Sequence, residues 1–138
     1  MIAYIDSSVI LRLVLGQAKP LSVWQRLERA VASDLARVEC LRTIDRARLV
    51  DRLDDLTVAT RRSGLLALID GMELVAVEQS ILDRAAEPFP TSISTLDALH
   101  LATALAIRAD IPALEFATHD ESLGNAAVAL GFEVHGIS

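Results

Sequence analysis

The chain has 138 residues, of which 52% are hydrophobic, and its 13 basic and 19 acidic residues give a formal net charge of −6. This composition excludes an intrinsically disordered chain, because disorder requires low hydrophobicity, and the length suits a single domain spanning residues 1–138. The acidic balance disfavours a protein that coats nucleic acid non-specifically, since such coating relies on Lys and Arg.

Strands and helices are expected to alternate from the N-terminus. The apolar run 2–5 ends at Asp6 and predicts a buried strand that leads into a helix over 8–15. A break follows, because Gly16 and Pro20 are helix stop and restart signals. The rest of this half is expected to form a helix over about 20–30, a very short strand over 31–33, a helix over about 35–48 capped by Asp34, and a further helix ending near Leu68.

The second half of the chain continues the alternation. Residues 73–77 predict the clearest internal strand, and 94–97 (STLD) fit a capping box that opens an Ala- and Leu-rich helix. The elements expected here are helices over about 79–87, 94–109 and 120–130, and strands over 114–118 and 132–135. Strands separated by helices pair in parallel through right-handed crossovers. The predicted fold class is therefore α/β, a three-layer α/β/α domain around a central parallel sheet of four to five short strands.

Targeting and redox features indicate the compartment. No apolar run reaches the roughly 20 residues that a membrane span requires, and the N-terminus has no basic leader. Cys40 is the only cysteine, so an intramolecular disulfide is excluded. We therefore expect a cytoplasmic domain that makes no contact with a membrane.

Four acidic residues are expected to meet at one edge of the sheet. Asp6 ends the first strand and Asp120 follows the strand over 114–118, and ligands of an open parallel sheet bind at the carboxyl ends of its strands. Glu39 and Asp97 lie near the starts of two helices that begin at the same edge. Two unit charges 4 Å apart repel by about 4 kcal/mol at an effective dielectric of 20, so such a cluster needs partners. Hard carboxylate oxygens suit Mg²⁺ or Mn²⁺.

Each of these acids also has a plainer role open to it. Asp6 and Asp120 are good N-caps for the helices that follow them. Asp97 fits the acidic half of a capping box, and Glu39 fits a solvated helix position. A shared site accounts for all four acids with one cause, whereas capping and solvation need a separate cause for each.

The acids lie in motifs that resemble a known family: Y-I-D-S-S at 4–8, R-V-E at 37–39, L-D-A-L-H-L-A-T-A at 96–104 and A-T-H-D at 117–120. In this order they resemble PIN-domain ribonucleases, and closer still the VapC-type toxins of prokaryotic toxin–antitoxin pairs, over nearly the whole chain. The segment 49–72 matches the family least distinctly, and partner or substrate choice is expected there.

The resemblance implies roles for these residues. Asp6, Glu39, Asp97 and Asp120 form an acidic catalytic site that holds one or two Mg²⁺ or Mn²⁺ ions. Ser8 supports the first aspartate, and Thr118 occupies a similar position beside the last acid. The implied activity is that of a metal-dependent endoribonuclease that hydrolyses RNA phosphodiesters. The implied partners are an RNA substrate, a cognate antitoxin protein and a second copy of the chain in a homodimer.

Other functions fit the residues less well. A phosphoacceptor receiver domain would need a basic residue at the end of a late strand, but Lys19 is the only lysine. A haloacid-dehalogenase-like phosphatase would need D-x-D where Ser8 stands. The alternative from another class is a non-catalytic or phosphate-responsive α/β module that binds a protein partner through the same acidic pocket.

Two further side chains stand beside the acids. His100 comes one turn after Asp97, and either packs in the core or reaches the site or a phosphate. Cys40 adjoins Glu39, but no His–Asp arrangement suggests a thiol nucleophile, so it is expected in the core.

Overall fold

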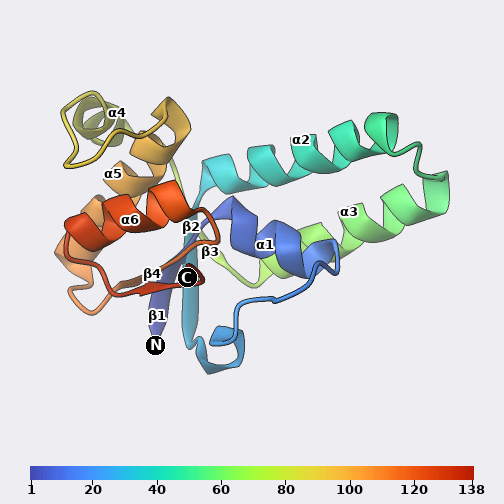
Figure 1. Cartoon of the computed structure of the whole chain (residues 1–138), viewed down its shortest axis with the longest axis horizontal. Coiled ribbons are helices and arrows are strands. Elements are labelled where there is room, and N and C mark those ends of the chain that lie inside the picture. Colours follow the sequence, from blue (N-terminus) through green and yellow to red (C-terminus); the bar gives the residue numbers. More distant parts are fainter.

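Five short apolar segments pair in parallel to form one sheet, in the order β3-β2-β1-β4-β5 (Figure 1). The computed structural model describes all residues, 1–138. The strands are β1 (Ile2–Ile5), β2 (Arg29–Ser33), β3 (Glu73–Val75), β4 (Glu115–Ala117) and β5 (Val134–His135). The helices are α1 (Ser7–Val14), α2 (Asp34–Val50), α3 (Asp55–Asp70), α4 (Gln79–Ala85), α5 (Thr95–Asp110) and α6 (Glu121–Ala129).

Helices cover both faces of the sheet, which confirms the three-layer prediction. Figure 1 shows α1, α2 and α3 on one side of the strands and α4, α5 and α6 on the other. The alternation of side chains along β1 explains the two cores. Ala3 and Ile5 pack with α1, α2 and α3, while Tyr4 packs with α5 and α6. Because β1 is central, the residue that follows it lies at the middle of the sheet's carboxyl edge.

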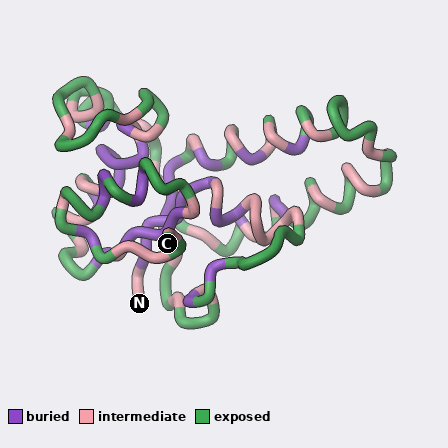
Figure 2. Tube along the Cα trace, viewed as in Figure 1, coloured by how far each residue is buried: buried purple, intermediate pink, exposed green.

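Helices α2 and α3 extend away from the sheet as an antiparallel pair (Figure 1). Figure 2 shows burial giving way to exposure towards the turn that joins them. Leu49, Val50 and Leu56 near this turn are 66%, 70% and 76% exposed. Such an exposed apolar group is typical of a surface that meets another protein. None of the helices has the length and apolar character needed to cross a membrane.

Two local predictions are wrong. The helix expected over about 20–30 is only a 3-10 turn, Trp24–Arg26, because β2 already begins at Arg29, whose guanidinium binds Glu73 of β3 through two 2.8 Å hydrogen bonds. Asp34 does not cap the next helix. Ser33 ends β2 in an extended conformation and caps α2 by accepting the Leu35 N–H at 3.1 Å.

Gly136 marks a close approach of the chain to the carboxyl edge of β4. Its φ is +104°, and a Cβ there would collide with the Thr118 carbonyl oxygen. We expect Gly136→Ala to lower the free energy of unfolding by at least about 2 kcal/mol, since the left-handed conformation is strained for alanine and the collision adds to that cost. Urea denaturation measures the change.

Gly64→Ala is the control, because its expected effect on the free energy of unfolding has the opposite sign. Gly64 lies inside α3, and a Cβ there would meet nothing within 4 Å. Gly64→Ala should raise the free energy of unfolding by about 0.5–1 kcal/mol, because alanine loses less backbone entropy in a helix. Equal effects of the two substitutions would contradict this account of Gly136.

Candidate functional site

Asp6 lies at the centre of the site, held by hydroxyl groups. It follows β1, caps α1 and is 5% exposed. Its Oδ2 accepts hydrogen bonds from Ser8 Oγ at 2.6 Å and from Thr118 Oγ1 at 2.9 Å. Its Oδ1 has only longer contacts, with Ser7 Oγ at 3.5 Å and His100 Nε2 at 3.8 Å. One carboxylate oxygen is therefore fixed by donors, while the other makes only long contacts.

The same hydroxyls join the start of α1 to the end of β4. Ser8 Oγ accepts the His119 N–H at 2.9 Å, and Thr118 Oγ1 accepts the Asp120 N–H at 3.0 Å. Thr118 is fully buried. Each hydroxyl thus donates to Asp6 and accepts from the backbone that leads to Asp120. This arrangement sets the first and last acids relative to each other.

Glu39 reaches the site from α2 and is bound by His100. His100 Nε2 lies 2.5 Å from Glu39 Oε1, and Tyr4 Oη lies 2.5 Å from His100 Nδ1. Ser7 Oγ donates to Glu39 Oε2 at 3.4 Å. His100 is 1% exposed. Its buried ring therefore contacts a site acid, and only the spacing of one helical turn from Asp97 indicated this in the sequence.

Burial and charge act in opposite directions on His100. Burial lowers its pKa, but the hydrogen bond to Glu39 and the negative charges of Asp6, Glu39 and Asp97 outweigh burial and raise the pKa above its ordinary value. Burial, together with the charges of Asp6 and Glu39, raises the pKa of Tyr4 well above its usual value. Tyr4 therefore keeps its hydroxyl proton and can donate a hydrogen bond.

Asp97 comes from the first turn of α5 and is half-buried. Its backbone N–H is capped by Ser94 Oγ at 3.2 Å. Burial raises the pKa of its carboxyl group, and the nearby charges of Asp120 and Asp6 raise it further. Asp97 is therefore a half-buried carboxylate that lies within reach of the charges of two other site acids.

Asp120 is the most open of the four acids. It is exposed and caps α6, with Oδ1 accepting the Leu123 N–H at 3.0 Å. Capping is thus a role of both Asp6 and Asp120, and it leaves each carboxylate a second oxygen. Because capping uses one oxygen only, it does not compete with a place in the acid cluster.

The donor set of Asp6, Glu39, Asp97 and Asp120 fits a hard divalent cation such as Mg²⁺ or Mn²⁺. The set is open rather than closed. The one group of three metal-ligating side chains with ligand atoms all within 4.8 Å of one another lies elsewhere. It comprises Glu115 of β4, His135 of β5 and Glu133, which directly precedes β5. An open site suits Mg²⁺, which keeps several waters and binds through one or two carboxylates and substrate phosphate.

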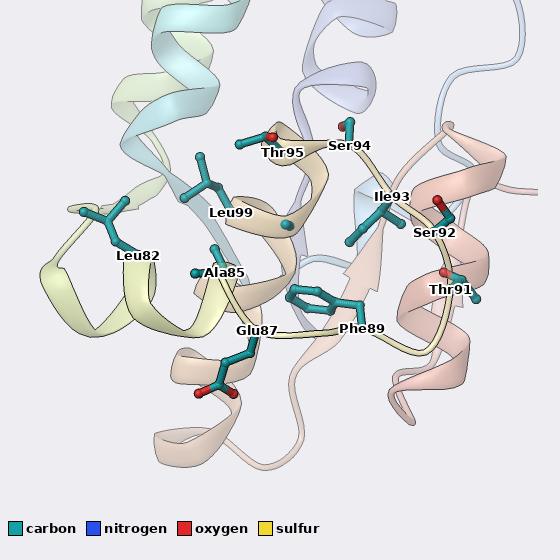
Figure 3. A pocket seen from close by; sticks show the side chains of 12 residues that line it. Leu82, Ala85, Glu87, Phe89, Thr91, Ser92, Ile93, Ser94, Thr95 and Leu99 are labelled. Atoms are coloured by element: carbon teal, nitrogen blue, oxygen red, sulfur yellow. The ribbon is translucent and has the colours of Figure 1, made fainter.

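A cavity of about 540 Å³ lies between α4, the segment that follows it and the start of α5 (Figure 3). Phe89, Ile93 and Leu99 line its apolar side, and the hydroxyl residues Ser94 and Thr95 lie at the start of α5. Asp97 belongs to the same turn of α5. The cavity has the size that ligands occupy in proteins, but none of the four acids lines it.

Cys40 lies next to Glu39 in the chain but in the core, as expected. It is fully buried, and its Sγ donates to the Ser7 carbonyl at 3.8 Å. Burial, with smaller effects of Glu39 and Asp6, raises its pKa to about 12. Because the thiolate is the reactive form, we expect no labelling of the folded protein by iodoacetamide at pH 8 and full labelling in urea. Fast labelling of the folded protein would contradict this placement.

Comparisons with known proteins agree with the fold and the motifs. The family model described as PIN domain matches residues 3–128. The protein named ribonuclease VapC46, from Mycobacterium tuberculosis, is 34% identical over 134 residues, which cover 95% of this chain and 94% of that protein.

Solved structures share the architecture at low sequence identity. VapBC2 from Rickettsia felis, bound to a DNA fragment from its promoter, superposes with a TM-score of 0.70 at 14% identity, covering 98% of this chain and 99% of that one. VapC20 from Mycobacterium tuberculosis, described as a sarcin-ricin loop cleaving toxin, has a TM-score of 0.62 at 15% identity and covers 94% of this chain and 95% of that one. At these identities the likeness shows the fold alone.

Proposed function

Since this chain belongs to the PIN-domain family, we propose that it is a metal-dependent endoribonuclease that acts in the cytoplasm as the toxin of a toxin–antitoxin pair. Residues 1–138 would form one catalytic domain. The observation that carries the proposal is the Asp6 carboxylate, which Ser8 and Thr118 hydroxyls hold on one oxygen and which shares the Ser7 hydroxyl with Glu39 through the other. The charges of Asp6 and Asp120 also act on Asp97. The likeness to a ribonuclease over 95% of the chain supports RNA as the substrate.

Asp6 and Asp97 would hold Mg²⁺ or Mn²⁺ directly or through water. Glu39 and Asp120 would complete the shell or orient the attacking water. An ion held there would lower the pKa of a water molecule and stabilise charge on the phosphoryl group. The residues of this chain supply position: Ser8 and Thr118 fix Asp6, and capping fixes Asp120.

The experiment is a cleavage assay with total cellular RNA, with Mg²⁺, with Mn²⁺ and with EDTA. Water is the nucleophile in the proposed reaction, so the products should carry 5′-phosphate and 3′-hydroxyl ends, and EDTA should abolish them. Primary products with 2′,3′-cyclic phosphate ends would contradict the mechanism. The absence of metal-dependent cleavage would favour a non-catalytic module that binds a partner through the acidic pocket. Sequencing the 5′-phosphate ends identifies the RNA.

We also propose a cognate antitoxin as a partner. Leu13 and Val14 of α1 and Gly64 and Leu68 of α3 line a cavity of about 380 Å³ that could receive an amphipathic helix. An arginine on the antitoxin suits the acid cluster, because a guanidinium pairs bidentately with carboxylates. Solved toxin–antitoxin complexes share this fold. Co-expression with the product of an adjacent small reading frame should relieve toxicity and yield a stable complex.

The homodimer is a separate part of the proposal. The exposed apolar side chains at the α2–α3 turn, Leu49, Val50 and Leu56, are available to a second copy. Light scattering after gel filtration should give twice the mass of the chain, and Leu49→Asp with Leu56→Asp should give the mass of one chain. A wild-type monomer would contradict the dimer without affecting the nuclease proposal.

A further inference from the structure

We propose that His100 is a positioning residue for Glu39 and that Tyr4 fixes the tautomer of His100 that this requires. The inference rests on the proposed nuclease function, because Glu39 has a place in metal binding only there. Neither Tyr4 nor His100 would touch the metal or the RNA. Both would act through the orientation of the Glu39 carboxylate.

The hydrogen bonds determine where the proton on the ring lies. An ionised carboxylate is only an acceptor, so the 2.5 Å contact between His100 Nε2 and Glu39 Oε1 requires a proton on Nε2. The Tyr4 hydroxyl faces Nδ1 at 2.5 Å and can donate to it. In the neutral ring, a donor at Nδ1 leaves the proton on Nε2, where Glu39 accepts it. In the protonated ring Nε2 also carries a proton, so Nε2 donates to Glu39 in either state. Tyr4, His100 and Glu39 thus form one chain of donors directed at the site.

The far end of this chain is rigid. Tyr4 is fully buried and stacks on Phe116 with ring centroids 5.1 Å apart and an angle of 22° between the planes. His100 meets the edge of the Tyr4 ring with centroids 5.9 Å apart. The central strand β1 supplies Tyr4, while α5 supplies His100. The imidazole therefore has a fixed place in the core from which to hold a side chain on α2.

Glu39 needs such a partner. It is 23% exposed on a helix surface, and its only other hydrogen bond is a 3.4 Å contact from Ser7 Oγ to Oε2. A free glutamate samples several rotamers. With Oε1 bound to His100, Oε2 is presented on the side of Ser7, whose hydroxyl also lies 3.5 Å from Asp6 Oδ1. His100 thereby turns one oxygen of Glu39 towards Asp6. Groups that orient metal ligands in this way change metal affinity or activity by about 10–100-fold when they are removed.

A pair of amide variants separates this role from core packing. His100→Gln places an amide N–H near the position of Nε2 and keeps a donor to Glu39. His100→Asn places its amide near Nδ1 and loses that donor. Tyr4→Phe keeps the buried ring and removes only the hydroxyl. Leu101→Ala is the packing control. Leu101 is fully buried on the same helix and packs in the hydrophobic core, and it makes no hydrogen bond to Glu39.

Three measurements are made on each variant: the Mn²⁺ dissociation constant by calorimetry, kcat and KM for RNA cleavage, and the melting temperature in EDTA. We expect His100→Asn to weaken Mn²⁺ binding or lower kcat by about 10–100-fold with KM for RNA unchanged. His100→Gln should stay within about 3-fold of wild type, and Tyr4→Phe should fall between the two. Leu101→Ala should lower the melting temperature and leave the Mn²⁺ dissociation constant unchanged.

Several outcomes would overturn the inference. One is wild-type Mn²⁺ affinity and kcat in His100→Asn, and another is an equal loss in the Gln and Asn variants. If His100→Asn does not fold, wild-type values in Tyr4→Phe would overturn it instead. A wild-type protein that neither binds Mn²⁺ nor cleaves RNA would overturn the proposed function itself, and the role of His100 with it.

Discussion

Asp6→Asn should lower RNA cleavage by at least about 100-fold while leaving the protein folded. Asparagine is as good an N-cap as aspartate. With its amide oxygen in the place of Oδ2, α1 keeps its cap and the Ser8 and Thr118 hydroxyls still donate to that oxygen. The effect comes from the loss of the Asp6 charge. Partners outside the ligand shell of a metal already contribute about 10–100-fold, so a residue that holds the metal itself should contribute at least as much. Cleavage rates in Mn²⁺ and the melting temperature in EDTA measure the two halves of this prediction.

Metal-dependent stability provides a second measure of the same substitution. A ligand that binds only the folded protein adds about 2.7 kcal/mol of stability at 100 times its dissociation constant. Mn²⁺ should therefore raise the melting temperature of the wild type and have little effect on Asp6→Asn. Asp54→Asn is the matched control, because Asp54 caps α3 by accepting the Thr57 N–H at 2.7 Å and lies outside the site. If Asp6→Asn unfolds the protein, the Asp6 carboxylate chiefly serves the fold through its hydrogen bonds with Ser8 and Thr118.

The edge that holds the site could be predicted from local patterns. Asp6 and Asp120 each follow a short apolar run, and parallel strands bring their carboxyl ends together. The alternation of elements then predicted three layers, and the structure confirms them. The chemistry of the four acids followed from residue type and placement, and their role in catalysis stays a prediction.

The network around the acids could not be predicted in this way. Tyr4 and His100 are 96 residues apart in sequence, and Glu39 and His100 are 61 apart. A histidine on an apolar helix is typical of core packing, and only the fold shows that both of its nitrogens have partners at the site. The false helix over 20–30 has a related cause, since strand pairing at Arg29 overrides local preference.

Asp97→Asn should stabilise the metal-free protein but abolish RNA cleavage. Burial and the charges of Asp120 and Asp6 raise the pKa of Asp97 in the folded protein. A raised folded pKa means that the ionised form is penalised by folding, so stability is lost as pH rises from the unfolded pKa through the folded one. At pH 7.5 in EDTA the asparagine variant should therefore melt higher than wild type. The gain should stay below about 1 kcal/mol, because partial exposure screens the charges.

The pH dependence identifies the cause of this gain. Below about pH 3.9, the unfolded pKa of aspartate, both proteins carry a neutral side chain and their melting temperatures should converge. With Mn²⁺ at neutral pH the wild type should have the higher melting temperature, because the cation stabilises its Asp97 carboxylate. RNA cleavage should be lost in the variant. Asp55→Asn is the control, as a first-turn aspartate on α3 that should lose slight stability with its helix-dipole interaction. A variant less stable than wild type in EDTA at pH 7.5 would show that Asp97 serves its helix rather than a cation.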